Sequence, residues 1–328
     1  MNEATVIVSF EGNGAKRRVV EETLGDVCRL VFLPDLTAEE RGKALSNADA
    51  LIANNLRVEL RSDEFRQLQG VKVIQLLTAG VDHAPFSSLP AEIPVAYVPG
   101  AFADAMAEHA VAMALAAAKR LFVEDQNMRQ GQFNQFTMNR KLAGGTCAII
   151  GFGGAGRATA RLLRCIGMKI HAVNRSGRTP EPVDFIGTTA DLEQVLRPAD
   201  LIVITLALTK NTIGLIGSRE LACLKEDAIL VNISRGEIVD EGALYKHLRN
   251  NPLFTACIEA WWIEPVRHGE FRTNYPFLEL PNVIAAPHNS ASVPGASVRA
   301  VRLGAENVRR VLLGEPSSSL VNDEERLL

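Results

Sequence analysis

The chain has 328 residues, of which 47% are hydrophobic and 22% charged, and it carries a formal net charge of -3 at pH 7. This is ordinary globular composition, and the length exceeds what one hydrophobic core usually holds, so two domains are expected. The small negative charge offers no basic field for nucleic acid or an anionic membrane. No apolar run reaches the roughly 18 residues of a membrane span, and the N-terminus does not resemble a signal peptide.

The cysteines are scattered and odd in number, and no C-x-x-C pair is present. They are Cys28, Cys147, Cys165, Cys223 and Cys257. This pattern predicts neither a metal site nor a disulfide framework. It favours buried thiols in a reducing compartment, and a cytoplasmic protein is therefore expected.

Short apolar segments alternate with amphipathic ones in the first hundred residues. The apolar segments predict buried strands at 4–10, 28–33, 48–54, 71–77 and 93–98. Between them, residues 16–25 and 38–47 have helical periodicity. Alternating strands and helices predict a parallel sheet covered by helices.

A second alternating series follows a long helix predicted at 103–121 and a polar loop at 126–141. Its expected strands are 145–150, 168–173, 183–187, 200–205, 228–233, 255–260 and 282–287. A last helix, at about 293–313, is expected to return to the first domain. The predicted organisation is one domain of residues 1–101 and 289–328, with residues 102–288 inserted as a second domain.

A glycine loop joins the first strand of the second series to its helix. Gly151, Gly153 and Gly156 form G-x-G-x-x-G, with an apolar strand before them and an amphipathic helix after them. The first glycine permits a tight turn, the second a close approach of backbone to a pyrophosphate, and the third close packing of helix on strand. The helix N-terminus adds free N–H groups for phosphates. The segment therefore predicts a dinucleotide site.

The next strand ends in HAVNRSGR, where an acidic residue usually holds the ribose of NAD. Here Asn174, Arg175 and Ser176 occupy that place. They carry no negative charge against a 2′-phosphate, and Arg175 offers a fork of donors that suits one. The sequence favours NADP over NAD, although a solvated turn with a surface arginine fits the same residues.

Three ionisable residues follow three late strands: Arg235, Glu264 and His288. The carboxyl ends of parallel strands form the ligand edge of such a sheet. Taken singly, a surface ion pair, an acid at a helix start and a turn histidine would explain them. Together, behind a nucleotide fold, they favour a catalytic set.

The chain resembles the D-isomer-specific 2-hydroxyacid dehydrogenase family along nearly its whole length. The resemblance rests on LLTAGVDH, VPGAFADAMAEHAVAMALA, GFGGAGRATA, VNISRGEIVDEGAL, the IEP of WWIEP, APHNSAS and ENVRRVLLGEP. It implies two Rossmann-like, doubly wound parallel-sheet domains: a flavodoxin-like substrate domain and an inserted NAD(P)-binding domain. It also implies a cytoplasmic homodimer, joined through the long helices and residues 121–141.

The resemblance assigns roles to the site residues. Arg235 would bind the substrate carboxylate and polarise the carbonyl, His288 would exchange the proton, and Glu264 would raise the pKa of His288. The backbone N–H groups around Ala79, Gly80 and Val81 would also bind the substrate carboxylate. Further cofactor contacts are implied at Gly154, Ala155, Asn174, Ile233, Ser234 and Glu259. The family usually has Asp where this chain has Glu259.

The expected reaction is reduction of a small 2-keto acid, of glyoxylate or hydroxypyruvate type, to the D-2-hydroxy acid. Formate dehydrogenases resemble the family but pair the histidine with Gln, so Glu264 argues against that activity. Phosphite oxidation uses a similar triad and stays open. A different class also stays open: corepressors that resemble the family bind NAD(H) and keep the triad, but serve mainly as partner-recruiting dimers.

Overall fold

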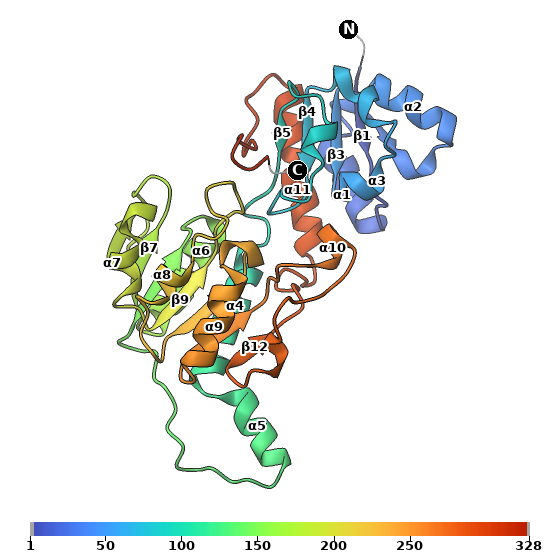
Figure 1. Cartoon of the computed structure of the whole chain (residues 1–328). Coiled ribbons are helices and arrows are strands. Elements are labelled where there is room, and N and C mark those ends of the chain that lie inside the picture. Colours follow the sequence, from blue (N-terminus) through green and yellow to red (C-terminus); the bar gives the residue numbers. More distant parts are fainter. Residues whose placement is uncertain (1–2, 327–328) are drawn as a thin grey trace. The chain divides into compact units, whose positions relative to one another are not determined.

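The structure, a computed structural model, describes residues 3–326 and divides into two compact units. Unit 1 comprises Met1–Phe102 and Val293–Leu328, and unit 2 comprises Ala103–Ser292 (Figure 1). The second junction falls four residues after the 288/289 boundary expected from the sequence. The intervening residues contact unit 2, because the Ser290 amide donates to the Glu259 carboxylate at 2.8 Å.

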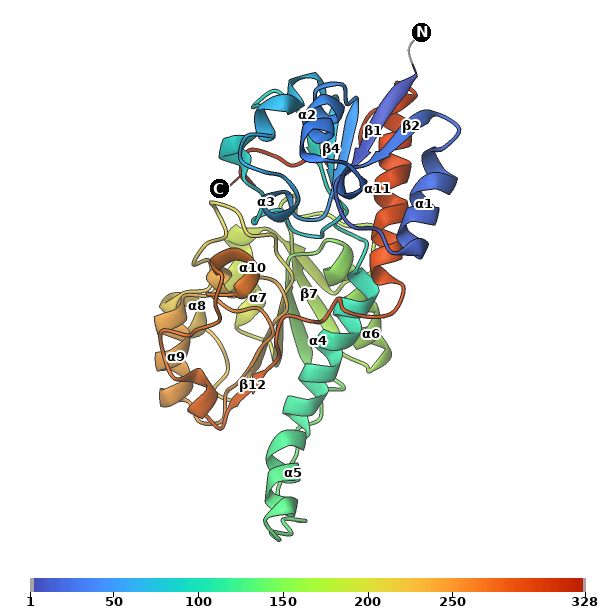
Figure 2. The ribbon, with the colours of Figure 1, turned by 90° about the vertical axis from the view of Figure 1, so that its right-hand side faces the viewer.

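Unit 1 is built on a parallel five-stranded sheet with the order β2-β1-β3-β4-β5. Its strands are β1 (Ala4–Val8), β2 (Cys28–Phe32), β3 (Ala50–Ala53), β4 (Val73–Leu76) and β5 (Val95–Ala96). Its helices are α1 (Gly14–Leu24), α2 (Ala38–Ser46), α3 (Leu56–Glu59) and α11 (Ala296–Leu312). Helices α1 and α11 lie side by side against the sheet (Figure 2), and their side chains form a core with those of β1 on one of its faces. A second core covers the other face.

Unit 2 contains a seven-stranded sheet with the order β12-β11-β10-β9-β6-β7-β8, in which every pairing is parallel. The strands are β6 (Thr146–Ile150), β7 (Lys169–Val173), β8 (Phe185–Gly187), β9 (Leu201–Ile204), β10 (Ile229–Asn232), β11 (Thr255–Ile258) and β12 (Val283–Ala285). The helices are α4 (Ala103–Ala118), α5 (Leu121–Arg129), α6 (Gly154–Cys165), α7 (Leu192–Leu196), α8 (Ser218–Leu221), α9 (Glu241–Asn250) and α10 (Pro265–His268). The central strands are almost entirely apolar and buried, as a sheet covered on both faces requires: β9 is apolar throughout, and the polar residues of β6 and β10 are Thr146 at the start of one and Asn232 at the end of the other.

The predicted sheets of five and seven strands are confirmed, and so is the α/β fold class. The helix predicted at 103–121 is α4, which ends at Ala118, three residues earlier than expected. A second helix, α5, begins at Leu121 after Arg120, whose φ is 54°. Helix α5 continues to Arg129, into the segment predicted as a loop. Two ion pairs between residues one turn apart stabilise α5: Arg120 with Glu124 at 3.2 Å, and Arg129 with Asp125 at 2.7 Å.

The cysteine expectation is partly wrong. Cys28, Cys147 and Cys257 are buried, whereas Cys165 is exposed and Cys223 half-buried. Burial raises the pKa of the Cys28 thiol to about 11, which makes it a poor nucleophile. Cys165 ends helix α6 on its solvent side, a position that composition alone does not reveal.

Between residues 3 and 326, no helix is long and apolar enough to cross a membrane. Within the same range, no cluster of three or more His, Cys, Asp or Glu side chains is arranged to hold a metal ion.

Candidate active site

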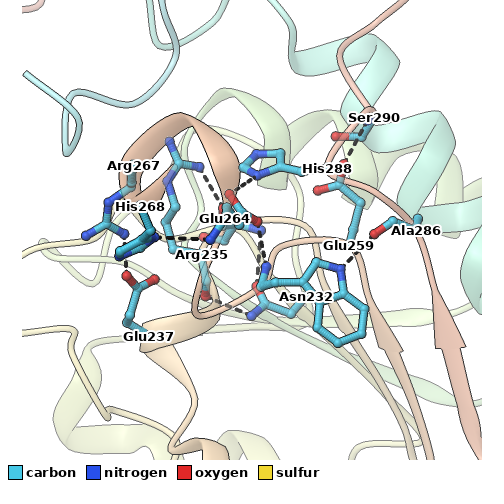
Figure 3. A network of polar contacts seen from close by, with 12 residues as sticks. Asn232, Arg235, Glu237, Glu259, Glu264, Arg267, His268, Ala286, His288 and Ser290 are labelled. Atoms are coloured by element: carbon cyan, nitrogen blue, oxygen red, sulfur yellow. Dashed lines mark hydrogen bonds and ion pairs between the residues drawn. The ribbon is translucent and has the colours of Figure 1, made fainter. Parts of the chain in front are cut away.

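The catalytic candidates of unit 2 follow three neighbouring parallel strands. The register pairs Asn232 of β10 with Ile258 of β11, and Ile258 with Ala285 of β12. The three strands therefore end at one edge of the sheet. Arg235, Glu264 and His288 lie just beyond these ends, and Figure 3 shows them side by side. The carboxyl edge of the sheet, predicted from the sequence as the ligand edge, thus brings Arg235, Glu264 and His288 together.

Asn232 organises the turn that presents Arg235. Its side-chain oxygen accepts the Ser234 amide at 3.1 Å, and its side-chain nitrogen donates to the Arg235 carbonyl at 2.8 Å. An asparagine that bonds backbone two and three residues ahead closes the turn directly after its strand. The Arg235 guanidinium donates to the Ser234 carbonyl at 2.7 Å.

Gly236 allows this turn to pack against the segment that carries Glu264. A Cβ at Gly236 would lie 2.3 Å from the carbonyl carbon of Trp261 and 2.4 Å from the nitrogen of Trp262. Both tryptophans are buried, and their indole nitrogens donate to the carbonyls of Ala286 and Val239 at 2.9 and 2.7 Å. They are packing residues that hold the three segments in place.

Glu264 and His288 form a hydrogen-bonded pair. The Nδ1 atom of His288 lies 2.7 Å from Oε2 of Glu264, and Oε1 of Glu264 accepts the Trp261 amide at 2.6 Å. The side chain of Glu264 is 11% exposed and that of His288 is 34% exposed. His288 has a φ of 51°, a left-handed conformation that is uncommon outside glycine and found often at functional sites.

The pair stabilises its ionised form. For His288, burial lowers the pKa, but the hydrogen bond and the charge of Glu264 outweigh it and raise the pKa above 6.5. For Glu264, burial raises the pKa, but His288, the Trp261 amide and the charge of Arg235 together lower it. A histidine whose pKa lies above its usual value is a proton donor near neutrality, beside a cation that can bind an anion.

The glycine loop has two kinds of glycine. A Cβ at Gly156 would lie 2.2 Å from the Gly151 carbonyl oxygen, and one at Gly151, where φ is 103°, would meet Thr205 and Leu206 backbone at 2.7 Å. The chain's own packing therefore requires both residues. A Cβ at Gly153 would meet nothing within 4 Å. Gly153 leaves an open approach to the N-terminus of α6, where Gly154 and Ala155 begin the helix.

The turn after β7 is held together by Asn174. Its side-chain oxygen accepts the Ser176 amide at 3.1 Å, and its side-chain nitrogen donates to the Arg178 carbonyl at 2.8 Å. Arg175 and Ser176 are exposed. The turn is therefore shaped before any ligand arrives, with its cationic and hydroxyl groups on the surface.

The remaining candidates differ in burial and place. Ile233 and Ser234 are buried beside the glycine loop, and the Ser234 hydroxyl donates to the Leu206 carbonyl. Glu259 is fully buried, and its Oε2 atom has no hydrogen-bond partner among the described residues. Ala79, Gly80 and Val81 follow β4 in unit 1, where the Thr78 hydroxyl donates to the Gly80 carbonyl at 2.8 Å.

Two contributions were missed by the sequence reasoning. Asn232 shapes the Arg235 turn, and an asparagine just past an apolar strand was an available signal. The second is an ion pair between Glu237 and Arg267, which joins the segment after Arg235 to helix α10 after Glu264. Its partners are 30 residues apart, and no local pattern indicates that pairing.

The chain matches the model of the "D-isomer specific 2-hydroxyacid dehydrogenase, NAD binding domain" family over residues 111–290. A glyoxylate reductase from Thermofilum pendens is 31% identical over 294 residues, which cover 87% of this chain and 85% of the relative. A glyoxylate reductase from Thermococcus kodakarensis is 32% identical, covering 86% and 85%.

Among solved structures, a candidate formate dehydrogenase from Pyrobaculum aerophilum has a TM-score of 0.82 and 27% identity, covering 98% of this chain and 99% of its own. The edge geometry, the glycine loop and these similarities agree. The chain belongs to the D-isomer specific 2-hydroxyacid dehydrogenase family and is an NAD(P)-dependent oxidoreductase of that family.

Proposed function

We propose that this protein reduces a small 2-keto acid, of glyoxylate or hydroxypyruvate type, to the D-2-hydroxy acid with NADPH. The observation that carries the proposal is the His288–Glu264 pair, at 2.7 Å, beside the cationic Arg235. This arrangement places a proton donor beside an anion-binding group at the carboxyl edge of a parallel sheet of the kind that binds dinucleotides. The similarity to glyoxylate reductases supports the substrate class.

In the proposed mechanism, Arg235 binds the substrate carboxylate and draws electron density toward the carbonyl oxygen. A guanidinium suits this task because its planar fork of donors matches a carboxylate. Since Glu264 engages Nδ1 of His288, the proton for transfer is held at Nε2. His288 gives that proton to the carbonyl oxygen and is reprotonated from solvent. A nicotinamide dinucleotide held by the glycine loop of unit 2 would supply the hydride that the carbonyl carbon accepts.

Residues of unit 2 fit the dinucleotide. The open space at Gly153 and the free amides of Gly154 and Ala155 suit a pyrophosphate. Gly151 and Gly156 shape the loop, and Ile233 and Ser234 border it. Glu259 offers a buried carboxylate oxygen to which no residue between 3 and 326 donates a hydrogen bond, and the amide of a nicotinamide would supply a donor.

The preference for NADP rests on the turn at 174–176. Asn174 is neutral, and Arg175 and Ser176 place donors on the surface where a 2′-phosphate would bind. A neighbour of the same fold from Rhizobium etli, 24% identical, has been solved with NADP.

Unit 1 is proposed to be the substrate domain. The backbone of Ala79, Gly80 and Val81, just past β4, would contribute contacts to the substrate carboxylate. Unit 2 is proposed to be the NAD(P)-binding domain.

We also propose a cytoplasmic homodimer joined through α5 and the following loop. This segment extends away from the sheet of unit 2 (Figure 1). It also exposes a set of large apolar side chains. They are Leu121, Phe122, Met128, Phe133, Phe136 and Met138, of which Phe136 and Met138 are 87% and 88% exposed. Burying such a patch against a second copy would remove it from water. Sedimentation of the wild type and of Phe136→Ser would test this, with the variant expected to dissociate more readily.

The deciding experiment measures oxidation of NADPH and of NADH with glyoxylate, hydroxypyruvate and pyruvate. Reduction of at least one keto acid, with a higher kcat/KM for NADPH, is expected. Further arms offer phosphite or formate with NADP⁺ and NAD⁺. Turnover of phosphite alone would replace the proposed substrate class. Dinucleotide-dependent dimerisation without turnover of any compound would contradict the proposed activity.

A further inference from the structure

Glu259 is a fully buried carboxylate that the proton-transfer steps do not use. It follows β11, and its backbone amide donates to the Asn232 carbonyl at 3.0 Å. Its carbonyl accepts the His288 amide at 3.0 Å, and its side-chain Oε1 accepts the Ser290 amide at 2.8 Å. One residue therefore connects the ends of three adjacent strands.

Two of these bonds fix the backbone at His288 and two residues beyond it. The carbonyl of Glu259 holds residue 288 itself, and its carboxylate holds residue 290. His288 has a φ of 51°, a conformation that non-glycine residues retain only where the surroundings impose it. The hydrogen bonds from residues 288 and 290 to Glu259 help to hold His288 in this conformation.

The charge of Glu259 also acts on the imidazole. The charged groups that act on His288 are Glu264, Arg235 and Glu259. Burial and Arg235 lower the pKa of His288, whereas both carboxylates raise it. Figure 3 shows the carboxylates of Glu264 and Glu259 on either side of His288.

The length of the side chain matters for the backbone contact. An aspartate is shorter by one methylene, so its carboxylate could not reach the Ser290 amide without a backbone shift in a close-packed region. Glutamine keeps the length and an acceptor oxygen but lacks the charge. The two substitutions therefore separate the reach of the side chain from its charge.

We propose that Glu259 is a positioning residue for His288, which holds the 288–290 backbone through Oε1 and leaves Oε2 free for a ligand donor. The kinetic part of this inference rests on the proposed role of His288 as proton donor. The structural part does not, and it can be measured without cofactor or substrate.

The first experiment follows the His288 ring by NMR in the cofactor-free protein, with its signal assigned by comparison with His288→Ala. In Glu259→Gln, the His288 pKa is expected to fall while the Ser290 amide stays slow to exchange. In Glu259→Asp, the Ser290 amide is expected to exchange about tenfold faster or more, since a hydrogen bond to a charged acceptor is lost.

Asp200→Asn is the matched control. Like Glu259, Asp200 accepts a backbone amide, that of Thr146, at 2.8 Å, but Asp200 is only partly buried and precedes β9 at the opposite edge of the sheet. This variant should change neither the His288 pKa nor Ser290 exchange. An unchanged His288 pKa in Glu259→Gln, or unchanged Ser290 exchange in Glu259→Asp, would overturn the proposal.

The second experiment measures kcat at saturating NADPH and keto acid, and the KM for NADPH from a series of NADPH concentrations. A positioning role predicts that Glu259→Asp loses about tenfold or more in kcat, because a misplaced donor transfers its proton poorly. A cofactor contact alone predicts a higher KM for NADPH with kcat unchanged, and that result would overturn the inference. If the wild type reduces no keto acid, the proposed function fails while the NMR result still decides the role of Glu259.

Discussion

The His288 corner and the turn at 174–178 lie at the same edge of one sheet, yet they are built differently. At the corner, the buried carboxylate of Glu264 forms hydrogen bonds with both the Trp261 amide and the left-handed His288. At the turn, Asn174 bonds to its own neighbours, and Arg175 and Ser176 face the solvent. The chain sets the geometry of the proton donor itself, whereas the proposed choice of dinucleotide depends on contacts that only a ligand completes.

The glycine loop repeats this contrast over a few residues. Gly156 packs against the Gly151 carbonyl, and Gly153 faces open space. One glycine is required by the protein and the other, in our proposal, by the cofactor. Substitutions at the His288 corner, at the turn and at the two glycines test this contrast.

The largest effect is expected at His288. His288→Ala should lower kcat by about 10² to 10⁴-fold, the range that general acid catalysis supplies, and leave the Kd for NADPH almost unchanged. Steady-state kinetics and fluorescence titration with NADPH measure the two quantities. An unchanged kcat would refute the proton-donor role.

Arg235→Lys keeps the charge but loses the planar fork. We expect a loss of about a hundredfold in kcat/KM for the keto acid, since a single misplaced donor costs as much in comparable anion-binding sites. The keto-acid saturation curve measures it. Wild-type kcat/KM would show that only the charge matters.

The two glycines provide a matched pair of variants. Gly156→Ala should destabilise unit 2 by about 1 to 3 kcal/mol, because its Cβ clashes with backbone. Gly153→Ala should keep the wild-type Tm but weaken NADPH binding by about tenfold. Thermal unfolding and dinucleotide titration of both variants test this. A lowered Tm in Gly153→Ala would contradict the assignment of that glycine to the ligand.

Arg175→Ala should raise the KM for NADPH by about tenfold and leave the KM for NADH nearly unchanged, as the loss of one charge-assisted hydrogen bond would do. Equal changes for both dinucleotides would show that Arg175 is a solvated surface charge.

The smallest effect concerns pH. Reduction needs protonated His288, so kcat should fall as pH rises through its pKa, which Glu264 holds above 6.5. Glu264→Gln removes that charge, and the falling limb should move to lower pH. The same raised pKa means that His288 adds stability at pH values below about 6.5 and loses it as pH rises through the folded-state pKa. If the falling limb of the kcat–pH profile stays at the same pH in Glu264→Gln, another group controls that limb.

The sequence predicted much of this molecule because its signals are local or periodic. Apolar segments gave both sheets, and residues just past strand ends gave Arg235, Glu264 and His288, since parallel strands end at one edge. The break at Arg120 and the Glu237–Arg267 pair were not predictable in this way. The first depends on one left-handed residue, and the second joins segments that only tertiary packing brings together.

The placement of helix α11 has a consequence for the order of folding. Its residues Val301, Ala305 and Val308 complete a core with Val6 and Val8 of the first strand. During synthesis, α1 can cover only part of that face, and the rest is covered only when almost the whole chain has been made, while residues 103–292 form a continuous stretch that can fold earlier. The segment made first is thus the last to be finished, and its exposed apolar face is the part of the nascent chain most in need of protection from aggregation.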